Sequence, residues 1–247
     1  MKILRVIHTV YGSFIFLILF LIFFIPLLFP IVFKKKFRWV GILNRYWGRL
    51  IFMGCFLPYK VECRAPLDPG RQYIFCPNHF SYLDIPTLAL NPVNTIFLGK
   101  NDMENIPLFG LMYRKLHITV DRASLKSKYD TILKARRAID EGKSLVIYPE
   151  GGIHSHIPPV LVRFKDGAFR LAIEKQIPIV PVTIPNNWII LPPDKFLVHR
   201  GRVRVIFHEP VETKGMTLRD LVPLKHQVFR KIEDELNQYA NRPGLAG

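Results

Sequence analysis

A long, unbroken run of apolar residues lies near the start of the chain. Residues 14–33 read FIFLILFLIFFIPLLFPIVF and contain no charged side chain. A helix of 20 residues is about 30 Å long, which matches the hydrocarbon thickness of a bilayer. Because Pro26 and Pro30 each remove a helical hydrogen bond, we expect a kink or break after Phe24. The run is too long for the apolar core of a signal peptide, and no small-x-small cleavage site follows it. It also exceeds an ordinary core helix, so we predict a membrane helix.

A second amphipathic segment follows at residues 37–58 and mixes large apolar residues with three arginines. Its aromatic residues, Trp39, Tyr46 and Trp47, are of the kind that settle at the headgroup level. Two arrangements are open: a kinked transmembrane helix followed by an interfacial helix, or two helices that enter one leaflet. Six basic residues lie between positions 34 and 49, against Lys2 and Arg5 before the apolar run. If the first helix spans, this asymmetry places the remainder of the chain on the cytoplasmic side of the inner membrane.

From residue 59 onward, short β-rich runs alternate with helical patterns. The predicted strands are 59–64, 72–76, 95–99, 117–121, 144–148, 179–184 and 202–207, and the predicted helices are 81–90, 107–115, 124–141, 167–176 and 223–240. Gly142 stands where a left-handed C-terminal cap belongs. This alternation predicts an α/β fold with a mostly parallel or mixed sheet of about seven strands flanked by helices. We therefore divide the chain into a membrane-associated helical segment, 1–58, and an α/β domain, 59–247.

Composition narrows the partners of this domain. The 247 residues carry 35 Lys and Arg against 19 Asp and Glu, a formal net charge of +16. Such a basic chain suits anionic lipid or nucleic acid, but no helix-turn-helix, zinc-finger or RNP-like motif is present. Three cysteines are too few for a disulfide framework, which indicates a reducing compartment.

The first candidate for chemistry follows the predicted strand 72–76, where residues 77–84 read PNHFSYLD. Ser81 is predicted as the N-cap of a helix, with Asp84 completing a capping box. A tight turn can then place the His79 imidazole against the Asp84 carboxylate, which fixes the ring tautomer and leaves one nitrogen as a base. Backbone N–H groups at the start of this helix are predicted to stabilise an oxyanion.

Other chemistries are weaker on this sequence. Cys76 lies at the end of an apolar strand, where a thiol is usually buried and inert. His154, His156 and Glu150 are close in sequence, but no second ligand pair follows at a recognisable spacing, so we expect no metal. As alternatives, Asp84 is only a capping carboxylate, or Glu150 only binds loop N–H groups and shapes the site.

Four segments in order resemble the blocks of the glycerolipid acyltransferase family. Asn78-His79-x-x-x-x-Asp84 resembles the first block, 116-LHITVDR-122 the second, 148-YPEGG-152 the third and 177-IPIVPVTI-184, with a central Pro181, the fourth. The run 164-FKDGAF-169 is also similar to one between the third and fourth blocks. The resemblance implies His79 and Asp84 as catalytic residues. It also implies substrate binding through Arg122, Glu150, Gly151 and Lys165.

The third block departs from the family pattern. The family commonly continues Glu-Gly with Thr-Arg or Thr-Ser, whereas Gly152 and Ile153 stand at these positions. A phosphate contact from this block is therefore in doubt, and Arg122, Lys100, Lys126 or Lys165 has to supply the charge for substrate binding. Arg122 is the best single candidate, because a guanidinium binds phosphate through two parallel hydrogen bonds.

The resemblance implies transfer of a fatty acyl group from a thioester to the free hydroxyl of 1-acylglycerol 3-phosphate, which gives phosphatidate. It implies acyl-coenzyme A or acyl carrier protein as the donor substrate, no cofactor, and membrane phospholipid and lysophospholipid as partners. A thioester is already activated, so a general base suffices and direct transfer needs no enzyme nucleophile. Two alternatives stay open: another acceptor, such as glycerol 3-phosphate or a different lysophospholipid, and a non-catalytic membrane-anchored lipid-binding protein.

Overall fold

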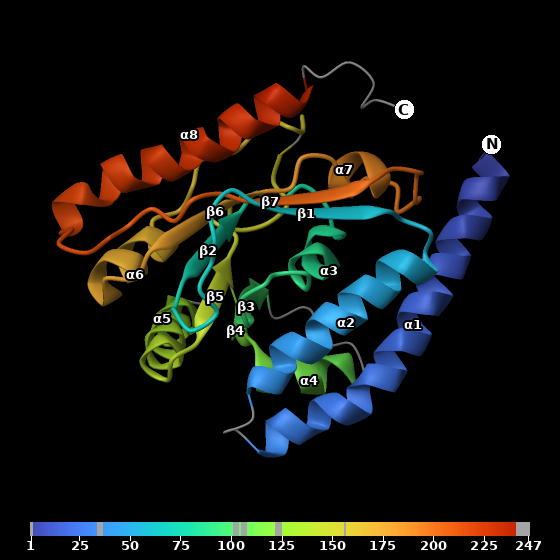
Figure 1. The fold of residues 1–247 in the computed structure, drawn as a ribbon, viewed down its shortest axis with the longest axis horizontal. Coiled ribbons are helices and arrows are strands. Elements are labelled where there is room, and N and C mark those ends of the chain that lie inside the picture. Colours follow the sequence, from blue (N-terminus) through green and yellow to red (C-terminus); the bar gives the residue numbers. More distant parts are fainter. Residues whose placement is uncertain are drawn as a thin grey trace.

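Seven strands form one mixed sheet in the order β1-β7-β6-β2-β5-β3-β4 (Figure 1). The computed structural model describes residues 2–33, 37–100, 104, 108–121, 125–155 and 157–240. The strands are β1 (Tyr59–Cys63), β2 (Ile74–Pro77), β3 (Thr95–Lys100), β4 (Ile118–Val120), β5 (Ser144–Ile147), β6 (Ile179–Thr183) and β7 (Val203–Phe207). β2 to β6 run parallel to one another, whereas β7 pairs antiparallel with β6 and carries β1 parallel to itself. All seven predicted strands and the mixed α/β class are confirmed.

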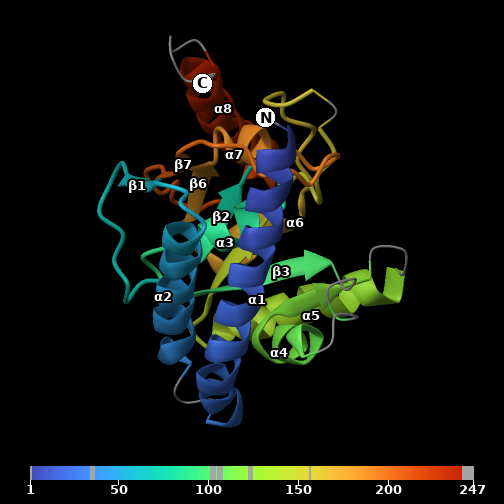
Figure 2. The ribbon, with the colours of Figure 1, turned by 90° about the vertical axis from the view of Figure 1, so that its right-hand side faces the viewer.

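The helices cover both faces of the sheet (Figures 1 and 2). They are α1 (Lys2–Val32), α2 (Arg38–Gly54), α3 (Asp84–Leu88), α4 (Phe109–Leu116), α5 (Leu125–Asp140), α6 (Gly167–Lys175), α7 (Asn187–Ile190) and α8 (Leu221–Ala240), and a short 3₁₀ helix, η3 (Leu218–Asp220), precedes α8. α5, α6 and α8 pack on one face, and α1 to α4 and α7 lie on the other side of the sheet. At the end of α5, Gly142 has φ +83°, as predicted for a left-handed cap.

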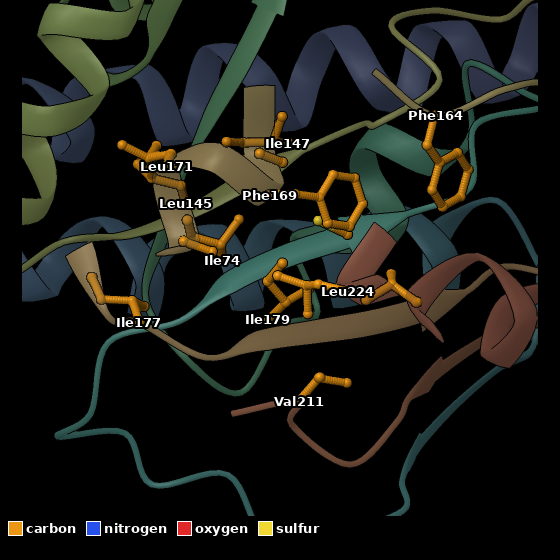
Figure 3. Packing of buried hydrophobic residues seen from close by; sticks show 14 of the residues in the cluster. Ile74, Leu145, Ile147, Phe164, Phe169, Leu171, Ile177, Ile179, Val211 and Leu224 are labelled. Carbon is orange, nitrogen blue, oxygen red and sulfur yellow. The ribbon is translucent and has the colours of Figure 1, made fainter. Parts of the chain in front are cut away.

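Strand alternation divides the core between the two faces. In β2, Ile74 packs toward α5, α6 and α8, whereas its neighbour Phe75 packs on the opposite face. Figure 3 shows Ile74 with Leu145 and Ile179 from the adjacent strands, facing Phe169 of α6. Because both faces are buried, the central strands read as continuous apolar runs, which is why the sequence pattern located them.

The N-terminal helix α1 is one continuous helix, so no break follows Phe24, and a kink there stays a prediction. Pro26 and Pro30 lie inside it, and Pro30 is buried. Leu27 packs with Val40 of α2 and Met112 of α4, and this packing offsets the lost hydrogen bonds. α1 is long and apolar enough to cross a membrane, and only 17% of its most apolar window is buried. The small buried share argues against a core helix of a soluble domain.

Candidate functional site

The candidate site lies at the carboxyl ends of three neighbouring strands. β2 pairs with β6 on one side and with β5 on the other, all parallel, so the segments after these strands meet at one edge. The segment after β2 carries His79, the segment after β5 carries Glu150, and α7 after β6 begins with Asn187. Residues about 70 and 100 positions apart along the chain are thereby brought into contact.

His79 and Asp84 form a hydrogen-bonded pair, as the sequence predicted. The His79 Nδ1 atom lies 3.0 Å from the Asp84 Oδ2 atom, and Asp84 is only 1% exposed. A carboxylate at Nδ1 favours the tautomer that carries its proton there, so the lone pair of Nε2 is available to take a proton. The arrangement has the geometry of a general base with an orienting carboxylate.

The turn between these residues keeps the predicted hydrogen bond from the Ser81 N–H to the Asp84 carboxylate, although the helix begins later than Ser81. α3 begins at Asp84, its N-cap is Leu83, and the Ser81 hydroxyl accepts the N–H of Leu83 and donates to the Leu191 carbonyl at 2.7 Å. The Asp84 Oδ2 atom accepts the N–H groups of Phe80 and Ser81, each at 2.9 Å. These two donors satisfy the buried carboxylate and are therefore not free to stabilise an oxyanion, so an oxyanion contact from the start of this helix stays a prediction.

Asn187 completes the environment of the carboxylate, and the sequence analysis did not find it. Its side-chain Nδ2 donates to the Asp84 Oδ1 atom at 3.0 Å and to the Thr87 hydroxyl at 2.9 Å. Oδ1 is held by this amide while Oδ2 faces the imidazole, so Asn187 positions the carboxylate for His79. The sequence feature that could have indicated Asn187 is its position shortly after the fourth block, behind a strand that lies next to β2.

Glu150 contacts the backbone of the site. Its Oε1 atom accepts the N–H of His79 at 2.7 Å, and its Oε2 atom accepts the N–H of Val162 at 3.2 Å. Burial, with a smaller effect of the Asp84 charge, raises the pKa of Glu150 to about 7 in spite of these hydrogen bonds. The structure therefore places Glu150 as a residue that shapes the loop around His79, which is the alternative that the sequence left open.

Tyr148 forms the surface on which the imidazole rests. Its ring stacks on His79 with centroids 4.0 Å apart and planes 22° apart. The phenol oxygen is buried and has no hydrogen-bond partner among the described residues. Burial, followed by the Asp84 charge, raises the pKa of the phenol well above its usual value, so the group stays protonated. This stacking restricts the ring orientation of His79.

The loop after Glu150 requires glycine. Gly151 has φ +81° and Gly152 has φ +152°, both in the region that disfavours side chains. A Cβ on Gly151 would also collide with the end of the Lys165 side chain, which lies across it. The family's threonine at position 152 would be strained in this backbone, so the departure noted in the third block has a conformational basis.

The other predicted binding residues are placed less completely. The backbone of Lys100 ends β3, on the same edge of the sheet as His79, and lies opposite Val120 of β4. Arg122, two positions after β4, lies outside the described residues, and so does His156.

The described residues contain no group of three or more His, Cys, Asp or Glu that could hold a metal ion. Cys76 is fully buried, and burial raises the pKa of its thiol, so it is not a nucleophile.

Comparison with known proteins identifies the family. Residues 59–185 match the model of the Acyltransferase family. A 1-acyl-sn-glycerol-3-phosphate acyltransferase of Haemophilus influenzae is 30% identical over 210 residues, covering 81% of this chain and 83% of that protein. The protein of the same name from Saccharomyces cerevisiae is 28% identical over 178 residues, covering 71% of this chain and 59% of that protein.

A solved structure supports the fold. The crystal structure of PlsC, the 1-acyl-sn-glycerophosphate acyltransferase of Thermotoga maritima, superposes with a TM-score of 0.81 over 98% of both chains at 23% identity. At this identity the likeness establishes the architecture, including the helices that precede the sheet. The family match covers the His79–Asp84 pair and the strands that hold it. The chain belongs to the acyltransferase family.

Proposed function

We propose that this acyltransferase moves a fatty acyl group from an acyl thioester to the free hydroxyl of 1-acylglycerol 3-phosphate, giving phosphatidate. One observation carries the proposal: His79 Nδ1 lies 3.0 Å from the buried Asp84 carboxylate, in a chain whose relatives are named for this reaction. The donor is acyl-coenzyme A or acyl carrier protein, both acidic molecules that suit a chain of net charge +16.

In the proposed mechanism, His79 Nε2 takes the proton of the acceptor hydroxyl while the hydroxyl oxygen attacks the thioester carbonyl carbon. The tetrahedral intermediate collapses, the carbon–sulfur bond breaks, and the imidazolium returns the proton to the departing thiolate. Asp84 holds the imidazole tautomer and stabilises its positive charge while the proton resides there. General-base catalysis of this kind contributes about 10²–10⁴-fold.

The acceptor phosphate requires a cationic site, for which the sequence offers Arg122, Lys100 and Lys165. The proposal is supported by the edge of the sheet that β3 and β4 share with His79, since both strands end there in parallel. Lys165 lies against Gly151, one residue from Glu150 and hence near the same edge. A bidentate phosphate contact remains best suited to Arg122.

The proposed place of action is the cytoplasmic face of the inner membrane, with α1 and α2 as the anchor. Protein contacts follow α1 closely: His8 Nε2 lies 2.8 Å from the Cys55 carbonyl oxygen, and Phe20 meets Phe109 of α4 with ring centroids 5.6 Å apart. If α1 crossed the bilayer upright, α4 with its basic Arg114 would enter the hydrocarbon. These contacts favour two helices that enter a single leaflet over a transmembrane span.

The main alternative is the same reaction with a different acceptor substrate. It is favoured by the third block, where the conformation of Gly152 excludes the family's usual threonine. The test is mass spectrometry of the lipid formed by purified enzyme from a defined acyl thioester with 1-acylglycerol 3-phosphate, glycerol 3-phosphate or another lysophospholipid. Phosphatidate as the main product supports the proposal. Robust turnover of glycerol 3-phosphate without turnover of 1-acylglycerol 3-phosphate would overturn it.

The variant His79→Ala distinguishes the proposed enzyme from a non-catalytic lipid-binding protein. Our mechanism expects turnover to fall by about 10²–10⁴-fold, the share of a general base, while vesicle binding is unchanged. Unchanged lipid conversion in this variant would remove His79 from the mechanism.

A further inference from the structure

Two exposed aromatic rings stand beside the His79–Asp84 pair. Tyr82, in the turn between these two residues, is 47% exposed, and Phe196 is 55% exposed. Their rings stack with centroids 5.1 Å apart and planes 28° apart. A stacked pair of large exposed rings at the edge of a site is a feature of surfaces that contact a partner or a membrane.

The loop that carries Phe196 connects the site to the N-terminal part of α1. At its start, the Leu191 carbonyl accepts the hydroxyl of Ser81, and further along, the Val198 N–H donates to the Thr9 hydroxyl at 2.9 Å. Figure 2 shows this segment, which follows α7, next to the N-terminal end of α1. The aromatic pair is therefore held between the catalytic turn and the apolar helix.

The surroundings of the pair are apolar and cationic. The N-terminal turns of α1 expose the apolar residues Ile3, Leu4, Ile7 and Val10. Arg5 of α1 and Lys195 of the loop lie near His199, whose pKa is lowered by burial and by these two charges. The loop, residues 191–202, contains one acidic residue, Asp194, against Lys195, Arg200 and Arg202. Aromatic rings flanked by basic side chains are typical of the headgroup level of an anionic membrane.

We propose that Tyr82 and Phe196 form a membrane-contacting surface on the catalytic domain itself, in addition to α1 and α2. The two rings insert among the headgroups of anionic phospholipid and hold the mouth of the His79–Asp84 site against the bilayer. This proposal rests on the proposed function for its lipid acceptor. A tail that stays in the membrane avoids the cost of transferring its methylenes to water, so an acceptor hydroxyl presented at headgroup depth reaches His79 without extraction.

The first experiment compares two forms of the acceptor with the double variant Tyr82→Ser/Phe196→Ser. One form is long-chain lysophosphatidate in vesicles of phosphatidylcholine and phosphatidylglycerol in equal parts, and the other is a short-chain lysophosphatidate dissolved as monomers. The matched control is Tyr129→Ser/Val222→Ser, whose residues are 62% and 64% exposed on α5 and α8. These helices cover the opposite face of the sheet.

We expect the double variant to lose about 10-fold in kcat/KM on vesicles, the effect of withdrawing two partly buried rings from the interface, and less than about 2-fold on the monomeric acceptor. The control should match the wild type on both. Unchanged activity on vesicles would overturn the proposal. An equal loss on both acceptors would also overturn it, because the rings would then shape the site rather than contact lipid.

A second measurement does not depend on turnover. Tryptophan fluorescence of the Phe196→Trp variant, bound to the same vesicles containing brominated lipid, should be quenched more than that of the wild type, which has three tryptophans. Tyr129→Trp should add no quenched component. If the two variants behave alike, the rings do not enter the membrane. If the wild type turns over neither acceptor, the proposed function fails while this measurement still decides the membrane contact.

Discussion

The sharpest test of the site geometry is the replacement of Asn187, which is 1% exposed and donates a hydrogen bond to Asp84. Leucine has nearly the shape of asparagine and lacks its amide. Asn187→Leu therefore removes the hydrogen bonds to the Asp84 Oδ1 atom and to the Thr87 hydroxyl and leaves the volume filled. The Thr87 hydroxyl still donates to the Leu83 carbonyl at 2.7 Å, so the principal unsatisfied atom is the buried carboxylate oxygen.

The expected loss of kcat follows from the hydrogen bond that the Asp84 Oδ1 atom loses in this variant. A hydrogen bond to a charged group contributes about 1.5–3 kcal/mol, and a buried charged atom without it pays at least this amount. If the whole loss appears as misorientation of the dyad, kcat falls by about 10- to 150-fold, since 1.4 kcal/mol corresponds to a factor of ten. KM should be nearly unchanged, because Asn187 is buried and acts through the carboxylate that orients the base.

The assay is continuous release of thiol from an acyl thioester at saturating acceptor, with urea denaturation to measure the free energy of unfolding. Asn186→Leu is the matched control: Asn186 is also buried, but its amide donates to the Arg202 carbonyl and not to the dyad. We expect both variants to lose stability and only Asn187→Leu to lose kcat. Equal losses of kcat in the two variants, or full kcat in Asn187→Leu, would refute a role for Asn187 in positioning Asp84.

Three further predictions concern buried polar groups. Burial raises the pKa of Glu150 to about 7, so its contribution to stability is complete below pH 4.5 and is lost as the pH rises through 7. In urea denaturation, the free energy of unfolding of the wild type should therefore fall by about 3 kcal/mol relative to Glu150→Gln over this range. Tyr148→Phe removes a buried hydroxyl without a described partner, so the free energy of unfolding should stay equal or rise by about 1 kcal/mol, and a clear fall in thermal denaturation would contradict this. Burial, with the charges of Lys231 and Arg64, lowers the pKa of His208 to about 4; stability should therefore fall by about 3 kcal/mol between pH 6.5 and 4, and His208→Gln should flatten that part of the acid-denaturation curve.

The sheet could be predicted from the sequence because its central strands are buried on both faces. Runs such as 144-SLVIY-148 and 179-IVPVTI-184 are apolar at consecutive positions, which is the pattern of a covered parallel strand. The His-x-x-x-x-Asp spacing located the dyad for a similar reason, since a turn of five residues keeps the two side chains within reach of each other. Local pattern and local geometry agreed at both places.

The order of the strands could not be read in the same way. β2 lies between β6 and β5, so Asn187 contacts Asp84 from 103 positions away and Glu150 contacts His79 from 71 positions away. Neither contact leaves a periodic signal, because each depends on which strands become neighbours. The same holds for α1, whose prolines predicted a kink or break: the helix is unbroken, and Leu27, next to Pro26, packs against α2 and α4.

The turn at Asp84 shows that a buried carboxylate takes up backbone donors, which the spacing of residues in the sequence does not reveal. A carboxylate with 1% exposure must have its oxygens satisfied, and here it takes the N–H groups of Phe80 and Ser81 together with the Asn187 amide. Those N–H groups are the donors that a helix start could otherwise have offered to an oxyanion. A buried acid that orients a base therefore consumes the donors nearest to it. In this site an oxyanion therefore needs donors other than the N–H groups of Phe80 and Ser81.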